Sequence, residues 1–314
     1  MKILVIIVSY NFERWIDRCL GSLRQSEQQA DVVVVDNASQ DRTVQLIESR
    51  YPEVRLIKSR ENLGFGRANN LGMAIALNEG HDAVFLLNQD AWIAPDTLGI
   101  LSQLSRLHPE YGILSPTHLT GNGDKLEKGF AAYAGLQETE LPMNTTFSEG
   151  GDLNKASLAP KHPVLKPISF VNAAFWLIPT DILKRVGGFC PLFYHYGEDV
   201  DYINRLHYHG YRVGYSPTVS GCHDRENRPV TRAAFLRSEQ VYLLSEYANI
   251  RHPFLKAFGY GVLASIKKAL LAGLRGRVKD ASAYLRITTG LLGKTREVIG
   301  YRRRNKQQGT WYLP

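Results

Sequence analysis

The run Ile3-Leu4-Val5-Ile6-Ile7-Val8 passes directly into Ser9-Tyr10-Asn11 and indicates the fold class of this chain. Its apolar residues follow one another without the alternation that marks a strand with one exposed face. A short, unbroken aliphatic run of this kind is typical of a parallel strand that is buried on both faces. We therefore expect the chain to open with a central strand of a parallel sheet.

Three similar runs follow within the first hundred residues, at 32–35, 54–57 and 83–87. Between them lie amphipathic stretches such as 15–24 and 43–48, which have the spacing of helices. Strands that alternate with helices form right-handed β–α–β units and an open parallel sheet. The sequence thus predicts an α/β fold with an open, mostly parallel sheet flanked by helices.

Polar side chains gather where these strands are expected to end, and ligands of open parallel sheets collect at the carboxyl ends of the strands. The three ends carry Ser9-Tyr10-Asn11, Asp36-Asn37-Ala38-Ser39 and Asn88-Gln89-Asp90. Helix capping explains Ser39 about as well as ligand binding does. It explains Asp36 and Asp90 less well, because each directly follows an apolar run. The sequence therefore predicts a binding crevice at this edge of the sheet.

Two acidic groups are candidates for chemistry. Asp90 is suited to hold Mg²⁺ or Mn²⁺, because hard cations prefer oxygen ligands and often share them with substrate phosphates; the alternative is a solvated aspartate in a turn. Glu198-Asp199-Val200-Asp201 precedes a helix expected at 204–208. The start of a helix stabilises acidic residues without any function, but three neighbouring carboxylates repel one another, which favours a general base among them. Asp201 and Arg205 have the spacing of a structural ion pair.

Other features are less specific. His223 ends a strand-like run at 214–220 and could ligate a metal or carry a proton, although a lone histidine usually does neither. The loop at 61–70 contains Gly64-Phe65-Gly66 but lacks the third glycine of a dinucleotide-binding fingerprint. Its glycines allow a close approach to a ligand, and we expect Asn69 to start a helix that faces it. The stretch at 117–167 has the composition of loops, and no function is assigned to it.

Taken in order, the motifs resemble the family 2 glycosyltransferases, and within them the rhamnosyltransferase-like branch. The matching stretches are Val8-Ser9-Tyr10-Asn11, Val34-Val35-Asp36-Asn37-Ala38-Ser39, Asn62-Leu63-Gly64-Phe65-Gly66 with Ala68-Asn69-Asn70, Leu86-Leu87-Asn88-Gln89-Asp90, Gly187-Gly188-Phe189, Gly197-Glu198-Asp199-Val200-Asp201 and His223. Each motif is weak alone, and the ordered set is specific. The resemblance implies a GT-A fold and an inverting, single-displacement transfer of a sugar from a nucleotide-diphosphate donor.

The resemblance also implies roles for single residues. Asp199 is the expected general base, supported by Glu198, while Asp90 and His223 are expected to hold Mg²⁺ or Mn²⁺. Trp176, in the strand-like run 170–179, is expected to bind the acceptor. Asp36 is expected to read the base or ribose of the nucleotide. The complete set of expected donor-binding residues is Ser9, Asn11, Asp36, Asn37, Gly64, Asn69, Asn88 and Gln89.

One departure from the family pattern concerns the metal. The Asp-x-Asp motif of the family appears here as Asn88-Gln89-Asp90. An amide can hydrogen-bond ribose or phosphate but contributes no charge to a cation. We therefore expect weaker metal binding, with more of the ligands supplied by the donor and by His223. Asn-x-Asp forms are familiar in the rhamnosyltransferase-like branch, which hints at dTDP-rhamnose as the donor.

The net charge of +8 is concentrated at the end of the 314-residue chain. Fourteen Lys and Arg and two acidic residues follow residue 250, whereas 24 basic and 28 acidic residues precede it. Apolar residues recur there at helical spacing from Leu255 to Leu274. Because the uncharged run 257–266 is shorter than the ~20 residues that span a bilayer, we do not expect a transmembrane segment. Either a basic helix lies on a membrane or it packs on the catalytic domain.

We accordingly expect a GT-A catalytic domain at 1–229 and a basic helical C-terminal extension at 230–314. A nucleotide-sugar half would occupy about 1–116, and an acceptor half about 117–229. The acceptor would be a saccharide or a polyprenyl-linked glycan in surface-polysaccharide synthesis. Three isolated cysteines indicate a cytoplasmic location, at the inner face of the membrane if the extension binds anionic lipid. The basic tail would also suit nucleic acid electrostatically, but no nucleic-acid partner is expected.

Two other classes of function remain open. A nucleotidyltransferase acting on sugar phosphates also uses a nucleotide-binding sheet, but it needs a Gly-rich, basic signature that Ser9-Tyr10-Asn11-Phe12-Glu13 does not supply. A non-catalytic carbohydrate-binding module is compatible with the sixteen tyrosines and the basic tail. It leaves the acidic pair Glu198-Asp199 without a purpose.

Overall fold

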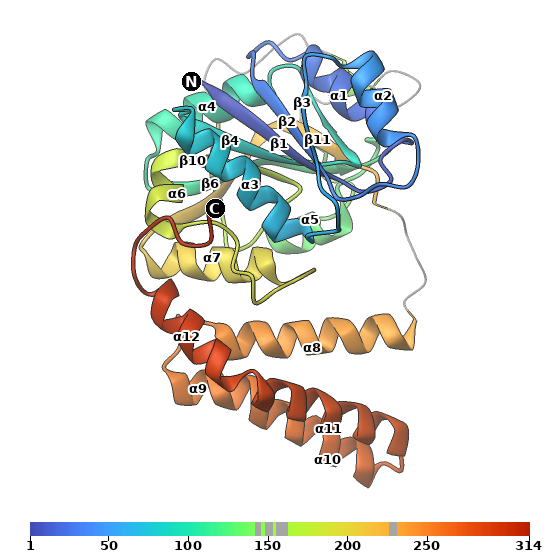
Figure 1. Cartoon of the computed structure of the whole chain (residues 1–314), viewed down its shortest axis with the longest axis vertical. Helices are drawn as coiled ribbons and strands as arrows, with labels where there is room; N and C mark the ends of the chain where they lie inside the picture. The colour runs from blue at the N-terminus through green and yellow to red at the C-terminus, as the bar shows by residue number, and fades with distance from the viewer. Residues whose placement is uncertain (142–145, 148–152, 155–162, 226–230) are drawn as a thin grey trace.

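The structure is a computed structural model that describes residues 1–141, 146–147, 153–154, 163–225 and 231–314. Figure 1 shows a sheet flanked by helices, with a group of long helices from the last third of the chain below it. The chain returns from these helices, and its last residues contact the sheet-containing part again, where Asn70 Nδ2 donates to the Tyr312 carbonyl at 3.0 Å and the N–H of Gly188 donates to the Trp311 carbonyl at 2.8 Å.

The first four long strands are parallel, as predicted. They are β1 (Ile3–Ser9), β2 (Asp31–Asp36), β3 (Arg55–Lys58) and β4 (Ala83–Asn88), in the sheet order β3-β2-β1-β4. The connecting helices are α1 (Ile16–Arg24), α2 (Thr43–Arg50) and α3 (Phe65–Asn78). The register pairs Ser9 with Asp36 and Val8 with Asn88. The polar ends of three strands therefore meet at one edge of the sheet.

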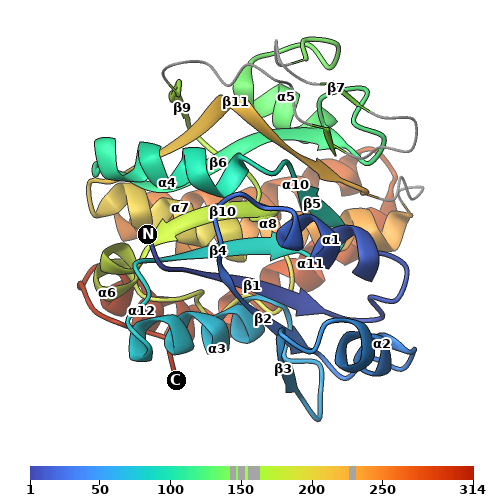
Figure 2. The ribbon, with the colours of Figure 1, turned by 90° about the horizontal axis from the view of Figure 1, so that it is seen from above.

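Both faces of the sheet are covered by helices, which explains the unbroken apolar runs. Leu4 and Ile6 of β1 pack in a core shared with α3, with α6 (Thr180–Val186) and with α7 (Glu198–Tyr208). Ile3, Val5 and Ile7 face the opposite core, with α1, α2 and α4 (Thr97–Leu107). Figure 2 shows the strands running between these helix layers.

The remaining strands make the sheet mixed. β10 (Phe175–Pro179) is antiparallel to β4 and to β6 (Tyr111–Thr120), and β6 is parallel to β11 (Arg212–His223). β5 (Ala91–Ile93) and β9 (Lys166–Ile168) are antiparallel to β11. A separate pair, β7 (Thr146–Phe147) and β8 (Leu153–Asn154), and α5 (Lys128–Ala134) complete this part. The expected division near residue 116 lies inside β6, so one sheet runs through both halves.

The C-terminal extension is helical, as expected. It comprises α8 (Arg232–Ala248), α9 (Phe254–Phe258), the π-helical turn η1 (Gly259–Leu263), α10 (Ala264–Leu274), α11 (Val278–Gly293) and α12 (Thr295–Asn305). A third core joins Leu243 and Tyr247 of α8 to Val262 and to Phe193, which precedes α7. The expected boundary at residues 229 and 230 falls at 226–230, outside the described residues.

α9, η1 and α10 form one run, Phe254–Leu274, of 21 residues. By length and composition alone this run is apolar enough to cross a membrane, and 33% of its most apolar window is buried inside the protein. The uncharged run 257–266 is only part of this helix, because Lys267 and Lys268 lie within it. Length and composition do not distinguish a spanning helix from one that lies on a surface.

Candidate active site

The polar residues at the ends of β1 and β2 are close together, as predicted. Ser9 Oγ donates to Asp36 Oδ1 at 3.0 Å, and the backbone N–H of Ser39 donates to Asp36 Oδ2 at 3.1 Å. Ser9 and Asp36 are both buried. Ser39 Oγ also donates to Asp36 Oδ1, so the carboxylate is fixed by β1 and by its own loop, and Oδ2 keeps a lone pair for a ligand.

Amide side chains join the neighbouring loops. Asn11, in the left-handed region with φ 54°, donates its backbone N–H to Ser39 Oγ at 2.9 Å, and its Oδ1 accepts from the N–H of Gln40 at 2.9 Å. Asn37 Oδ1 accepts from the N–H of Leu63 at 3.3 Å. The backbone of the crevice is thus held by the residues that were expected to bind the donor, and their contacts with a nucleotide remain predictions.

Gln89 joins the ends of β1 and β4. Its Oε1 accepts from the N–H of Tyr10 at 2.8 Å, and its Nε2 donates to the carbonyl of Tyr10 at 3.2 Å. The side-chain amide therefore pairs with a peptide group as a neighbouring strand would. In the structure Gln89 positions the loop after β1, and its predicted contact with the donor would have to use the remaining lone pair or N–H.

The glycine loop leads into α3 earlier than expected. The expectation that Asn69 starts a helix is wrong, because α3 begins at Phe65 and Asn69 Nδ2 donates to the Phe65 carbonyl at 3.0 Å. Gly64 has φ 78°, and a Cβ added there would lie 2.4 Å from the Tyr194 carbonyl oxygen. Glycine is needed at this position because the loop before α3 packs on the loop before α7.

The acidic motif lies in the first turn of α7, which begins six residues earlier than expected, at Glu198. Gly197 precedes it in the left-handed conformation, with φ 86°. Glu198 is buried, its Cβ lies 3.9 Å from the position of a Cβ added at Gly66, and its Oε2 has no hydrogen-bond partner among the described residues. α7 thus begins directly against the glycine loop.

The environment raises the pKa of both carboxyl groups. Burial, with the nearby charge of Asp199, raises the pKa of Glu198 to about 8. Burial also raises the pKa of Asp199, although the backbone N–H of Val200, which donates to Asp199 Oδ1 at 2.8 Å, and the charge of Arg225 oppose this shift. Two adjacent carboxyl groups with raised pKa values are typical of sites that transfer protons.

The predicted ion pair in α7 is confirmed. Arg205 Nε lies 2.8 Å from Asp201 Oδ2, and both side chains are buried. Arg205 also donates to the carbonyls of Val186 at 2.6 Å and Gly188 at 2.7 Å. Asp201 is therefore occupied by a structural contact that fastens α7 to the Gly187-Gly188-Phe189 turn.

Asp90 and His223, the expected metal ligands, are neighbours. β5 pairs with β11 so that Ala91 lies opposite His223, and the N–H of Asp224 donates to the Asp90 carbonyl at 2.8 Å. This pairing leaves Asp90 Oδ1 and His223 Nε2 3.3 Å apart. Asn88 Nδ2 lies 3.4 Å from the same nitrogen. The three residues named from the sequence thus converge on one point.

Sequence analysis did not identify Glu127, which holds His223 from the other side. Glu127 Oε2 lies 3.3 Å from His223 Nδ1, and Arg225 Nη1 lies 3.1 Å from Glu127 Oε1. Burial disfavours the charged imidazole, but bonds to Asp90 and Glu127 outweigh it and raise the pKa of His223 to about 9. Glu127 lies in the stretch 117–167, which carried no motif, and only the folded sheet brings it to β11.

The geometry fits a metal with few protein ligands. Neighbouring ligands of an octahedral ion, each about 2.1 Å from it, lie about 3 Å apart, close to the 3.3 Å between Asp90 Oδ1 and His223 Nε2. Among the described residues, no group of three or more His, Cys, Asp or Glu side chains could hold a metal ion. Asp90 and His223 could therefore supply two ligands, with oxygens of a bound diphosphate and water completing the shell.

The expectation that Trp176 binds the acceptor is wrong. Trp176 is 0% exposed, its ring stacks on Phe189 with centroids 6.0 Å apart, and its Nε1 donates to the Val171 carbonyl at 3.2 Å. Its polar atom is satisfied and its ring fills the core between β10 and α7, so no acceptor can reach it. An aromatic residue within an apolar strand is more often part of the core than of a site.

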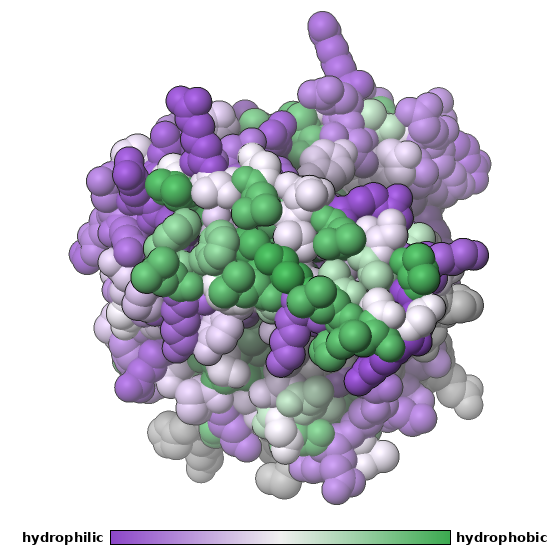
Figure 3. All heavy atoms as spheres, turned by 90° about the horizontal axis from the view of Figure 1, so that it is seen from below, coloured by the Kyte–Doolittle hydropathy of each residue, from purple (hydrophilic) through white to green (hydrophobic). Residues whose placement is uncertain are grey.

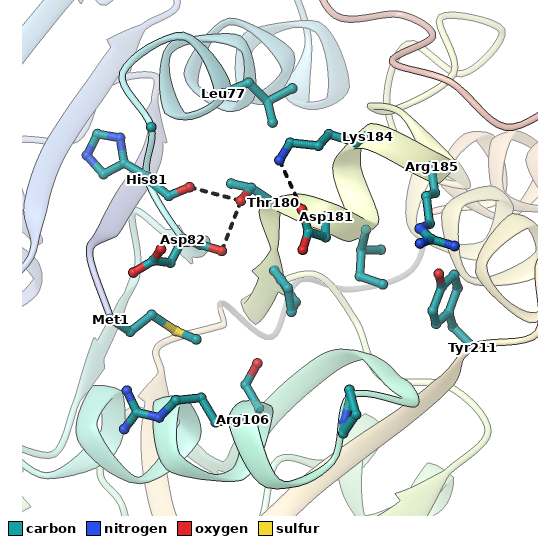
Figure 4. Close-up of a pocket in the computed structure, with 15 residues that line it drawn as sticks. Met1, Leu77, His81, Asp82, Arg106, Thr180, Asp181, Lys184, Arg185 and Tyr211 are labelled. Carbon is teal, nitrogen blue, oxygen red and sulfur yellow. Dashed lines mark hydrogen bonds and ion pairs between the residues drawn. The ribbon is translucent and has the colours of Figure 1, made fainter.

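A cavity of about 770 Å³ lies elsewhere, at the opposite edge of the sheet. Figure 4 shows Met1, Asp82 and Thr180 around it, with Arg106 and Lys184 from helices α4 and α6. None of the expected donor, metal or catalytic residues lines this cavity. Its position at the amino ends of β1 and β4 separates it from the crevice described above.

Two family models match the chain. The model for glycosyl transferase family 2 matches residues 4–130, and a model described as glycosyltransferase (GlcNAc) matches residues 103–273. Together they cover the sheet, the acidic motif and the first helices of the extension. All the site residues described above, from Ser9 to His223, lie within these matches.

Two curated proteins are similar to this chain over most of their length. The low-salt glycan biosynthesis hexosyltransferase Agl10 of Haloferax volcanii is 27% identical over 242 residues, 76% of this chain and 71% of that protein. An N-acetylglucosaminyl-diphospho-decaprenol L-rhamnosyltransferase of Mycobacterium tuberculosis is 27% identical over 269 residues, 78% of this chain and 85% of that protein. The solved structure of Staphylococcus aureus TarS 1–349 with UDP-GlcNAc matches with a TM-score of 0.57 at 15% identity, over 98% of this chain and 88% of that one. This likeness establishes the GT-A fold.

Proposed function

The chain belongs to family 2 of the glycosyltransferases, and on that premise we propose that it is an inverting enzyme that moves a sugar from a nucleotide diphosphate to an acceptor hydroxyl. The observation that carries this proposal is the start of α7, where Glu198 and Asp199 have raised pKa values and Glu198 lies against the glycine loop. The nucleotidyltransferase and binding-module alternatives are set aside, because the family transfers sugars.

In the proposed mechanism Asp199 is the general base. The acceptor hydroxyl gives its proton to the Asp199 carboxylate while its oxygen forms a bond to the anomeric carbon of the donor. The bond from that carbon to the diphosphate oxygen breaks on the opposite side, so the configuration inverts. A base is more effective when its pKa is nearer to the working pH, and burial shifts the pKa of Asp199 in that direction.

Glu198 would assist Asp199 as a neutral neighbour. With a pKa of about 8, Glu198 is mostly protonated at neutral pH. Two adjacent carboxylates cannot both carry a charge cheaply in a buried site. Keeping the proton on Glu198 leaves the charge on Asp199, where the acceptor proton is to be received. At neutral pH the pair therefore carries one proton, which is on Glu198, and Asp199 is the member that can act as a base.

Asp90 and His223 would hold Mg²⁺ or Mn²⁺, as their separation of 3.3 Å permits. A divalent cation there would offset the charge that develops on the departing diphosphate. His223 must lose a proton to serve as a ligand, because only the neutral imidazole binds metal. Asn88 would contact the diphosphate or ribose and would add no charge to the metal site.

We propose a donor and an acceptor from the descriptions of the relatives. A rhamnosyl donor and a polyprenyl-diphosphate-linked acceptor are supported by the Mycobacterium tuberculosis relative, which is described as an N-acetylglucosaminyl-diphospho-decaprenol L-rhamnosyltransferase. The form Asn88-Gln89-Asp90 favours dTDP-rhamnose as that donor. The Haloferax volcanii relative, a hexosyltransferase, leaves other hexoses open. We propose that the enzyme works in surface-polysaccharide synthesis as a peripheral protein on the cytoplasmic face of the membrane.

A panel of nucleotide sugars tests the proposal. The full-length protein is titrated with dTDP-rhamnose and with common UDP- and GDP-sugars in the presence of Mg²⁺ or Mn²⁺, and heats of binding are recorded. A single preferred donor, followed by a product with inverted anomeric configuration in NMR spectra, is expected. A protein that binds none of these donors, or that retains the anomeric configuration, would contradict the proposal.

A further inference from the structure

The helices of the C-terminal extension present one exposed apolar face. Its core consists of large aliphatic side chains that are between 53% and 85% exposed: Leu255, Leu263, Leu270, Leu274, Val278 and Leu285. We call these six residues the apolar face. Figure 3, a view from below Figure 1, shows a band of apolar side chains crossing this side of the molecule. Single exposed apolar residues are ordinary, whereas a band of them marks an interaction site.

The opposite side of the same helices is already occupied by protein. A Cβ added at Gly261 would lie 2.6 Å from Tyr247 Cβ of α8, which shows how closely η1 packs there. Ser265 Oγ of α10 lies 2.7 Å from Thr288 Oγ1 of α11 inside the helix pair. The helices that carry the apolar face therefore pack on α8 and on each other through one stripe, and the apolar face is a second, separate stripe. Packing on the catalytic domain does not account for it.

The charges around the apolar face indicate which kind of partner this face binds. The exposed cations on these helices and on the turn between α10 and α11 are Lys256, Lys267, Arg275, Arg277, Lys279 and Arg286. The two acidic residues after residue 250 are Asp280 and Glu297, and Asp280 is paired with Arg232 at 2.8 Å. An apolar surface with a strong excess of positive charge complements a bilayer that contains anionic lipid.

We propose that the apolar face lies flat on the surface of an anionic phospholipid bilayer. The apolar side chains would enter the boundary between head groups and acyl chains, and the lysines and arginines would contact lipid phosphates. A spanning arrangement of Phe254–Leu274 is disfavoured, because it would strip Gly261 and Ser265 of their partners and place Lys267 and Lys268 in hydrocarbon. This inference rests on the proposed function, in which the acceptor is lipid-linked.

The arrangement connects the bilayer to the catalytic residues through one helix. Gly197, two residues before Asp199, packs against Val241 and Ser245 of α8. Gly261, in the layer that carries the apolar face, packs against Leu243 and Tyr247 of the same helix. A single helix layer, α8, thus lies between the layer that carries the apolar face and the start of α7, which carries the proposed base. The head group of a lipid-linked acceptor in that bilayer would be held close to Asp199.

Vesicle flotation with the full-length protein tests the inference. Wild-type protein should float with vesicles of phosphatidylglycerol and phosphatidylcholine, should not float with pure phosphatidylcholine, and should be released by high salt. The double substitution Leu270→Glu and Leu274→Glu should lower the fraction bound by about tenfold or more. The control Leu107→Glu changes a leucine of α4 that is 61% exposed and lies outside the apolar face, and it should leave binding unchanged.

Other outcomes would overturn the inference. Equal flotation of the wild type and the double variant would do so, as would resistance to extraction at alkaline pH, which indicates a spanning helix. A wild-type dimer that the double variant converts to a monomer, with vesicle binding unchanged, would show that the face pairs two copies. Titration of the same proteins with the donor nucleotide sugars tests the proposed function separately from membrane binding. Vesicle binding without any nucleotide-sugar binding would contradict the proposed function and leave the membrane surface standing.

Discussion

Glu127 Oε2 lies 3.3 Å from His223 Nδ1, and the other ring nitrogen of His223 faces Asp90. A carboxylate behind a ligating histidine fixes the ring orientation and supports the ligand, and loss of such a partner typically lowers metal affinity about 10–100-fold. The relationship joins residues 96 positions apart in the chain. It makes Glu127 a positioning residue of the proposed metal site.

We predict that Glu127→Gln weakens Mn²⁺ binding about tenfold or more, measured by calorimetric titration with metal. The matched control is Glu110→Gln, because Glu110 pairs with the half-exposed His108 at 3.6 Å on the surface. Thermal unfolding of both variants checks that the fold is retained. Unchanged Mn²⁺ affinity in a folded Glu127→Gln protein would remove Glu127 from the site.

Stability should respond to pH through Glu198. The folded protein raises the pKa of Glu198 from 4.5 to about 8, so between these pH values the folded state binds more protons than the unfolded state. The free energy of unfolding contributed by Glu198 therefore falls as pH rises through this window. Glu198→Gln should raise the Tm at pH 8.5 by roughly 2–4 °C or more relative to wild type.

The same comparison at pH 4.5 checks the sign, because Glu198 is then protonated in the folded protein and the difference should shrink. Scanning calorimetry at both pH values measures it. Asp181→Asn, at an exposed aspartate in the first turn of α6, is the control and should show little dependence. A variant that is equally stabilised at both pH values would show that packing, and not ionisation, is responsible.

Gly64 should tolerate no side chain. Its φ of 78° disfavours other residues, and an added Cβ would lie 2.4 Å from the Tyr194 carbonyl. Gly64→Ala should lower the free energy of unfolding by about 2 kcal/mol or more, because the left-handed strain of about 1–2 kcal/mol is joined by a backbone clash. It should also weaken donor binding.

Gly80→Ala is the matched control for this strain. Gly80 has φ 67°, and a Cβ there meets nothing within 4 Å. Its substitution should cost only the conformational penalty, about 1–2 kcal/mol. Denaturant unfolding curves of the two variants give the comparison, and equal losses would show that the contact with Tyr194 does not constrain the glycine loop.

The buried pair Asp201–Arg205 should matter far more than its exposed counterpart Asp181–Lys184. Removing one partner of a buried pair costs roughly 3–5 kcal/mol, because the other charge stays buried. Exposed pairs contribute about 0–1 kcal/mol. Urea unfolding of Arg205→Met and Lys184→Met should reproduce this difference. Similar, small losses in both variants would mean that Arg205 does not fasten α7 to the turn at Gly188.

Local patterns predicted much of this molecule. The unbroken runs at β1 and β4 identify parallel strands because burial on both faces leaves no polar position, and the spacing of Asp201 and Arg205 identifies an ion pair within one helix. Helix starts were placed less well, since α3 and α7 begin after glycines with positive φ, whose conformation depends on packing against another loop. Gly64 shows this dependence directly through Tyr194.

Contacts between distant segments could not be predicted from the sequence. Glu127 meets His223 only because β6 and β11 lie side by side, and no local motif marks that meeting. Trp176 was misassigned because an aromatic residue in an apolar run has the same pattern in a core as in a binding site. The sequence left open whether the apolar stripe of the extension lies on a membrane or packs on protein, and the structure divides this stripe into buried Val262 and exposed Leu270.

In the proposed mechanism Asp199 removes the proton from the acceptor, and the substitution Asp199→Asn takes away this base. The variant keeps the shape of the side chain and an oxygen that can accept from the backbone N–H of Val200. Turnover of the preferred nucleotide sugar with its acceptor, and the Kd for that donor, are measured on the same preparation, with Asp181→Asn as control. We predict turnover reduced by about 100-fold or more with an unchanged donor Kd. Turnover within a factor of about two of wild type, at unchanged donor Kd, would contradict the account.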